Sequence, residues 1–168
     1  YMVGALARMN LAKDRLHERT KADAAKALAV FPSTDIFHNN LAQAIEILHC
    51  VDASIDVLTH TTFTPEPVVT AKPREAVGVG VVEAPRGTLY HKVELGSDGI
   101  VRRGEIVVPT GQNQFNIEDD VRRLVQDLLP DTPKEKIAFE IEKLIRAYDP
   151  CMSCGSHFLT VNWSGGRS

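Results

Sequence analysis

The chain has 168 residues, of which 43% are hydrophobic and 24% are charged, and its formal net charge is −3. This size and balance predict a single globular domain over residues 1–168, with a buried core, and exclude a disordered or fibrous chain. No cluster of basic residues favours a nucleic-acid backbone, and no apolar run reaches the roughly 20 residues of a membrane helix, so we expect neither nucleic acid nor membrane as a partner.

Residues 1–60 are predicted to be helical. Good helix formers occupy residues 4–19, and a second helix is expected over 21–30 because a proline follows it. The strongest helical pattern begins at Asp35 or Asn39 and places apolar residues three or four positions apart. We expect this stripe to face the core, with the members Leu41, Ala44, Ile45, Leu48, Val51, Ile55 and Leu58.

A small antiparallel sheet is predicted within residues 77–110. Prolines among threonines over 61–76 indicate an irregular connection before it. The sequence GSDG between the last two β-prone segments is typical of a hairpin turn. The glycines of VGVGVVE predict a strand that packs closely against neighbouring backbone. The three strands are expected at Val77–Glu83, Leu89–Leu95 and Ile100–Val108.

Two further helices are predicted within residues 119–147. The first ends at Pro130, and the second has Pro133 at its first position, where a proline costs no hydrogen bond. The second helix ends before Pro150, so the polar motif at 149–157 lies in the turn beyond a rigid helix. Together these elements predict an α+β fold, a helical bundle with a small inserted antiparallel β-sheet.

Two of the three cysteines lie three positions apart in DPCMSCGSH, residues 149–157. This C-x-x-C spacing lets both sulfurs chelate one soft or borderline metal. Cys151, Cys154 and His157 could therefore hold zinc in a structural or interaction module. One of four histidines would complete that set: His38, His49, His60 or His91. The third cysteine, Cys50, is expected to be a buried structural thiol. With only three cysteines, this sequence alone cannot form a site of four.

Two other interpretations of the cysteine pair remain open. A thioredoxin-like dithiol is one, although that motif normally opens a helix after a strand, whereas this one follows a helix. The other is that the two sulfurs form half of a metal site whose remaining ligands lie in sequence not included here.

The sequence DPCMSCGSH resembles the C-terminal signature of the large subunit of nickel-iron hydrogenases, D-P-C-x-x-C-x-x-H. EAPRG at 83–87 and VVPT at 107–110 resemble two further segments of that family in the same order. YMVGALARMN at 1–10 and HNNLAQAIEIL at 38–48 also resemble its helical stretches, so the likeness covers nearly the whole chain. It implies the C-terminal half of an enzyme subunit that oxidises dihydrogen reversibly, inactive without the other half.

In this family, four cysteine thiolates hold a nickel and an iron, and the iron carries carbon monoxide and cyanide ligands. The resemblance implies that Cys151 is a terminal nickel ligand and that Cys154 bridges the two metals, whereas the other two cysteines belong to an early motif absent here. Arg86 matches an arginine over the open metal site. Thr110 matches a hydroxyl residue that hydrogen-bonds a cyanide, which needs a donor when buried, and Pro109 packs against the same wall.

The resemblance also implies a magnesium site and a path for protons. His157 matches a histidine that binds Mg²⁺, with the backbone carbonyl of Ile106 as another ligand. Asp149 matches an aspartate that pairs with the arginine region, so it could orient Arg86 and tune proton movement. Splitting dihydrogen requires a base for the proton, and either Cys151 or Arg86 could act as that base.

The partners implied by the resemblance are the N-terminal part of the same large subunit and a small subunit whose iron-sulfur clusters carry the electrons. A maturation endopeptidase would cut after His157 and remove residues 158–168. Because the sequence has no export or membrane signal, it resembles the cytoplasmic branch of the family, which passes electrons to a soluble cofactor such as a nicotinamide or a deazaflavin.

Overall fold

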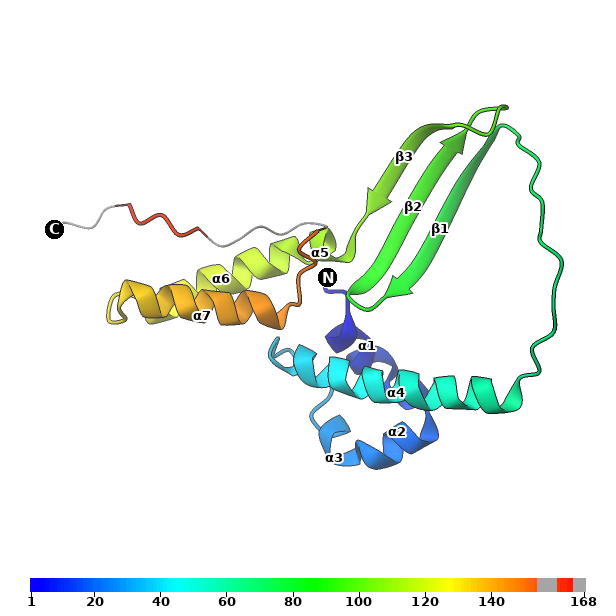
Figure 1. Ribbon diagram of the computed structural model, residues 1–168. Helices are drawn as coiled ribbons and strands as arrows, with labels where there is room; N and C mark the ends of the chain where they lie inside the picture. The colour runs from blue at the N-terminus through cyan, green and yellow to red at the C-terminus, as the bar shows by residue number, and fades with distance from the viewer. Residues whose placement is uncertain (154–159, 165–168) are drawn as a thin grey trace.

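The protein is described from a computed structural model, which covers residues 1–153 and 160–164 and combines helices with one antiparallel sheet (Figure 1). The predicted α+β class is therefore confirmed. In the first half, the elements are α1 (Ala5–Ala12), the 3₁₀ turn η1 (Lys13–Arg15), α2 (Glu18–Asp23), α3 (Ala25–Leu28) and α4 (His38–His60). They are followed by β1 (Ala76–Ala84), β2 (Gly87–Leu95), β3 (Val101–Val107), α5 (Pro109–Gln112), α6 (Gln114–Leu128) and α7 (Lys134–Ala147).

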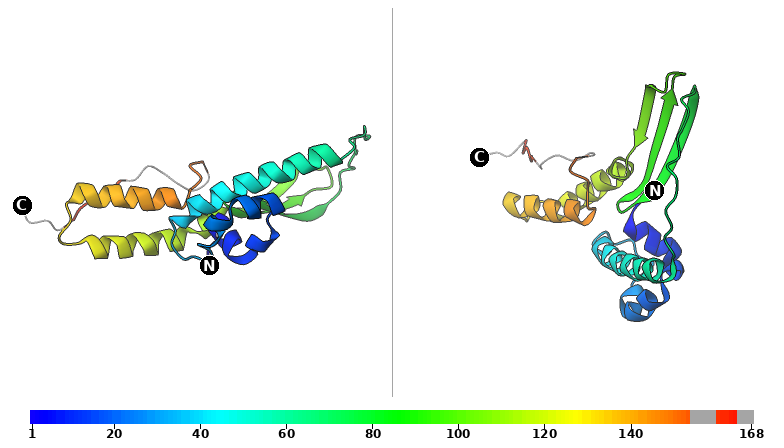
Figure 2. Two further views of the ribbon diagram at one scale, coloured as in Figure 1. Left: turned by 90° about the horizontal axis from the view of Figure 1, so that it is seen from below. Right: turned by 45° about the vertical axis from the view of Figure 1, so that its right-hand side comes forward.

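The core lies where α1, α4 and the end of α7 meet. Met9 of α1 and Ile45 of α4 are almost fully buried, and they are joined there by Leu144 from α7. Each such side chain contributes about 1.5–3 kcal/mol when it leaves water. This cluster fixes the C-terminal end of α7 next to the N-terminal helix, although the two are far apart in the sequence (Figure 2).

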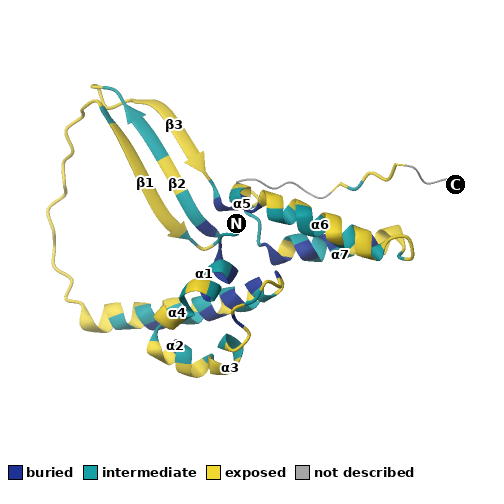
Figure 3. Ribbon diagram, turned by 180° about the vertical axis from the view of Figure 1, so that it is seen from behind, coloured by how far each residue is buried: buried dark blue, intermediate teal, exposed yellow. Residues whose placement is uncertain are grey.

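The predicted hairpins are confirmed, because the sheet is a meander in the order β1-β2-β3 with antiparallel pairing throughout. It extends away from the helices, and residues 61–75 connect the end of α4 to its far tip without regular structure, as expected from their prolines (Figure 1). Both β1 and β3 are exposed along nearly their whole length (Figure 3). The predicted close packing at Gly78 and Gly80 is wrong, because no atom lies within 4 Å of a Cβ built at either residue.

The predicted apolar stripe of α4 is partly wrong. Val51, Ile55 and Leu58 are exposed, and Cys50, predicted to be buried, is exposed as well. The buried face combines the apolar Ala42 and Ile45 with the polar Asn39 and Asp52. Asn39 accepts a hydrogen bond from the backbone N–H of Leu6 and donates to the carbonyl of Ala147, while Asp52 accepts from the hydroxyl of Thr20 at 2.6 Å. Polar groups whose hydrogen bonds are satisfied can be buried at little cost, which is why Asn39 and Asp52 can occupy this face.

The helix boundaries differ from those predicted at three points. The single helix predicted over 21–30 is instead two short helices, α2 and α3. The first helix ends at Ala12 rather than Arg19, because the chain turns through η1 and becomes extended at Leu16, which packs into the core. The helix predicted from Asp119 begins at Gln114. Within the part of the chain that is described, no helix has both the length and the apolar character needed to cross a bilayer.

Candidate metal centre

Arg86 lies at the turn between β1 and β2, where the hairpin reaches the helices. Ala84 and Gly87 pair across this turn, so Pro85 and Arg86 form its tip. Gly87 has φ 132°, and a Cβ there would lie 2.6 Å from Cγ2 of Val3. The turn can therefore approach the start of α1 this closely only with glycine at that position.

Asp149 follows the end of α7 and turns the chain sharply, with φ 50°. Arg86 donates from Nε to the backbone carbonyl of Asp149 at 2.7 Å and from Nη2 to Oδ1 at 3.0 Å. Gln43 of α4 donates from Nε2 to the other carboxylate oxygen at 2.9 Å. Both oxygens of the carboxylate are thus hydrogen-bonded, and its orientation is fixed by Arg86 from the β1–β2 turn and by Gln43 from α4.

Thr110 and Cys151 are joined by a direct hydrogen bond. Pro109 and Thr110 form the start of α5 and are both buried. The hydroxyl of Thr110 accepts from the backbone N–H of Cys151 at 3.1 Å. A hydroxyl that accepts can still donate its own proton to another acceptor, and the half-buried Cys151 is anchored by its backbone next to this group.

The other residues predicted for the site are not brought together by the described structure. Ile106 lies on β3 opposite His91 and is 60% exposed, while Cys154 and His157 lie outside the described residues. Among the residues that are described, no three His, Cys, Asp or Glu side chains gather to hold a metal. The four histidines predicted as alternative zinc ligands lie on α4, which carries His38, His49 and His60, and on β2, which carries His91.

Three residues of this region were not predicted from the sequence. Gln43 holds the Asp149 carboxylate, and Arg8 of α1 pairs with Glu46 of α4. The hydrogen bond from Arg8 to Glu46 is the largest cause of the raised pKa of the Arg8 guanidinium. Arg8 could have been noticed because it is a charged residue within the apolar sequence GALARMN. Gln43 could not, because a glutamine on an amphipathic helix is ordinary.

Two hollows flank the site. A groove of about 990 Å³ begins at Asp149 and Pro85 and continues along α4. Its far part is lined by the exposed apolar residues Ile47, Val51, Ile55 and Leu58.

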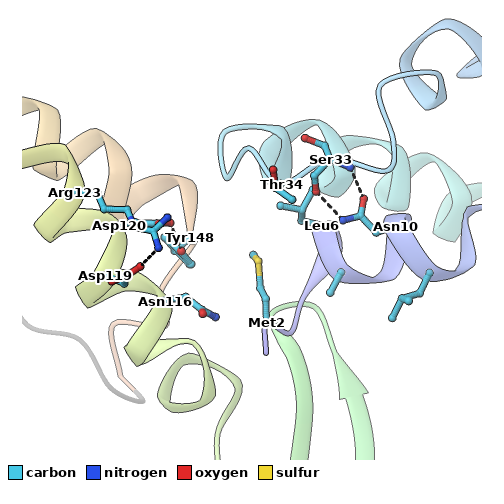
Figure 4. A pocket seen from close by; sticks show the side chains of 12 residues that line it. Met2, Leu6, Asn10, Ser33, Thr34, Asn116, Asp119, Asp120, Arg123 and Tyr148 are labelled. Atoms are coloured by element: carbon cyan, nitrogen blue, oxygen red, sulfur yellow. Dashed lines mark hydrogen bonds and ion pairs between the residues drawn. The ribbon is translucent and has the colours of Figure 1, made fainter. Parts of the chain in front are cut away.

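The second hollow, of about 460 Å³, lies between α1 and α6. Figure 4 shows Asp119, Asp120 and Tyr148 on one side of this second hollow and Asn10 and Ser33 on the other. Of the described residues predicted for the site, none lines it.

Comparison with known proteins gives a consistent result. The family model described as nickel-dependent hydrogenase matches residues 2–157. The chain is 34% identical to sulfhydrogenase 1 subunit alpha of Pyrococcus furiosus, covering 96% of this chain and 38% of that protein. It is 35% identical to the NAD-reducing hydrogenase HoxS subunit beta of Cupriavidus necator, covering 94% and 34% respectively.

Solved structures agree in fold. A crystal structure of an NAD⁺-reducing [NiFe]-hydrogenase in the H₂-reduced state has a TM-score of 0.69 and 32% identity, covering 94% of this chain and 36% of that one. The Ni-Fe-Se hydrogenase from D. vulgaris Hildenborough has a TM-score of 0.59 at 24% identity, covering 91% and 34%, and is similar in fold alone. The chain thus spans little more than a third of the length of these relatives.

Proposed function

Because the chain belongs to the nickel-dependent hydrogenase family, we propose that it is the C-terminal part of a hydrogenase large subunit and contributes to a nickel-iron centre for reversible oxidation of dihydrogen. The observation that carries this proposal is the convergence of three segments that are far apart in the sequence. Arg86 bonds Asp149, and Thr110 bonds Cys151, which lies two residues further along the chain.

The donor set fits a nickel-iron centre. Thiolates are soft ligands suited to such metals, and Cys151 and Cys154 would provide two, with two more from the N-terminal part of the same subunit. When bound, the centre would supply the site at which dihydrogen is split. The iron would carry carbon monoxide and cyanide ligands, and His157 with the carbonyl of Ile106 would hold Mg²⁺ nearby.

The residues around Cys151 would orient donors and move a proton. Thr110 accepts from the N–H of Cys151 and has a proton left to donate towards a cyanide nitrogen, while Pro109 limits the space beside it. The guanidinium of Arg86 is held by Asp149 at two points, so its position is fixed before the reaction begins. The proton acceptor would be the thiolate of Cys151, or Arg86 in its neutral guanidine form, because a guanidinium cannot accept a proton.

The partners proposed are the N-terminal part of the large subunit and an iron-sulfur small subunit. Three cysteines, two of them metal ligands, leave too few to hold an iron-sulfur cluster in this chain. The electron acceptor would be a soluble cofactor such as a nicotinamide or a deazaflavin, and the enzyme would work in the cytoplasm. A maturation endopeptidase would cut after His157 and release residues 158–168.

Replacing the proposed ligands tests this function. In the complete subunit expressed with its partner, we expect Cys151→Ser and Cys154→Ser each to abolish hydrogen oxidation and to lower bound nickel severalfold, because a hydroxyl is a poor ligand for a soft metal. Cys50→Ser is the matched control, since Cys50 is exposed on α4. Metal analysis, infrared bands of iron-bound carbonyl and cyanide, and dye reduction by dihydrogen measure the result.

Two outcomes would contradict the proposal. Nickel content and activity that survive both serine substitutions would exclude these cysteines as ligands. Stoichiometric zinc, with neither nickel nor the infrared bands in the unsubstituted subunit, would favour the zinc module instead.

A further inference from the structure

Arg8 links α1 to α4 and to the end of β1. Its guanidinium forms a two-pronged ion pair with Glu46, from Nε to Oε1 and from Nη2 to Oε2, both at 2.6 Å. Nη1 pairs with Glu83 at 2.5 Å. The Arg8 and Glu46 side chains are 25% and 18% exposed, so their ion pair is shielded from much of the solvent and holds the planar group in one orientation. The bond to Glu83 is more exposed, since that side chain is 44% exposed.

The same guanidinium holds the backbone immediately before Arg86. Nη1 donates to the carbonyl of Ala84 at 3.1 Å, and Nη2 donates to the carbonyl of Pro85 at 2.8 Å. One helical turn earlier, Gly4 lies against Arg86 itself, because a Cβ at Gly4 would be 3.0 Å from the Arg86 carbonyl oxygen. Gly4 and Arg8 share one face of α1, and this face receives the whole turn from Ala84 to Arg86.

Arg86 depends on this support for a precise position. Its side chain is long, and fixing such a chain costs about 2 kcal/mol of rotamer entropy. The hydrogen bonds from the Arg86 guanidinium to Asp149 therefore keep their geometry only if the backbone of Arg86 is also held in place. Asp149 is attached to the rest of the fold through Gln43 of α4, the helix that also carries Glu46.

We propose that Arg8 is a positioning residue: it ties the turn before Arg86 to α4 and so keeps the guanidinium of Arg86 against Asp149. Arg8 acts through the backbone of Ala84 and Pro85, to whose carbonyls it donates. The consequence for catalysis rests on the function proposed above, whereas the positioning itself requires no metal.

The test is the exchange of the Arg86 Nε proton with water, measured by NMR on the full chain labelled with ¹⁵N-arginine. The signal is assigned by its loss in Arg86→Lys. We expect Arg8→Met to speed this exchange about tenfold, as for the loss of one hydrogen bond. Arg8→Lys is expected to give a similar increase, because an ammonium cannot bond both Glu46 oxygens and two carbonyls at once.

The matched control is Arg102→Met, which breaks an exposed ion pair with Asp98 in the β2–β3 hairpin and should leave Arg86 unchanged. If Arg8→Met loses its helical circular dichroism, Glu46→Gln replaces it, since that change keeps Arg8 and removes the charge that orients it. Unchanged exchange of Arg86 in a folded variant would overturn the proposal. The Arg86 Nε exchange is measured without metal. A chain that bound no nickel would therefore contradict the proposed function but not the positioning role of Arg8.

Discussion

Asp149 is the residue on which the site geometry depends most. It adopts φ 50°, a conformation that costs a non-glycine residue about 1 kcal/mol or more, although aspartate tolerates it better than most. The cost is met because its carbonyl and both carboxylate oxygens are hydrogen-bonded, by Arg86 and Gln43. The family resemblance predicted that Asp149 pairs with Arg86. It did not predict the bond from Gln43, because a glutamine in an amphipathic helix gives no sign of such a partner.

Thr110 gives a prediction at this scale. Thr110→Val keeps the shape of the buried side chain but removes the acceptor for the Cys151 N–H. We expect a loss of about 1 kcal/mol in unfolding free energy, because the partly buried N–H of Cys151 loses its bond to Thr110, measured by urea denaturation of the chain. In the metal-loaded subunit, the infrared bands of cyanide should shift as well.

Thr110→Ser is the control for that change, since it retains the hydroxyl. Equal stability of the valine and serine variants would show that the hydrogen bond from Cys151 to Thr110 contributes nothing measurable.

Among the elements, α4 shows most clearly which structural features cannot be predicted from the sequence. Hydrophobic spacing predicted that the helix exists but not which of its faces is buried, because Asn39 and Asp52 took positions inside. Each has its polar atoms paired with a residue distant in the sequence, and such partners carry no local signal. The irregular segment at 61–75 was predictable, since its prolines cannot enter a ladder or a helix interior.

The contact between α2 and α4 predicts a pH dependence. His17 just before α2 bonds Asp56 of α4, from Nε2 to Oδ2 at 2.8 Å, and this hydrogen bond lowers the pKa of Asp56. A carboxyl with a depressed folded pKa stabilises the fold above its unfolded value, near 4, and this contribution is lost as the pH falls through the folded value. The pair should therefore stabilise the protein at pH 6 but not at pH 2.

Asp56→Asn checks this expectation. Its urea midpoint should lie below that of the unsubstituted chain at pH 6, and the two midpoints should converge at pH 2. A difference that stays the same at both pH values would contradict the role of this charge.

At the scale of the molecule, the described residues form one exposed apolar groove. The groove along α4 is lined by Ile47, Val51, Ile55 and Leu58, each at least 42% exposed. Contiguous apolar patches of this kind are uncommon on soluble monomers. The family was predictable because its sequence motifs are spread across the chain, and the α+β class was predictable from strong hydrophobic periodicities. The exposed groove along α4 was not predictable, because apolar residues at helical spacing are normally expected to be buried.

Dye binding measures that surface. We expect the chain to increase the fluorescence of anilinonaphthalene sulfonate, and the double change Ile55→Glu and Leu58→Glu to reduce the increase severalfold, because two charges would enter the groove. Val68→Glu is the matched control, since Val68 is 92% exposed outside the groove. An equal signal from both variants would place the dye elsewhere.

The exposed connection at 61–75 has a consequence for how the site can change over evolutionary time. Arg86 and Asp149 are held to the N-terminal helices by Arg8, Gly4 and Gln43, all of them contacts through space. The connection itself contributes none of these contacts, and a longer closed loop costs only about 0.6 kcal/mol for each doubling of its length. Insertions at 61–75 are therefore tolerated by the geometry, so a descendant protein could gain a new surface or an additional module there while its chemistry remained intact.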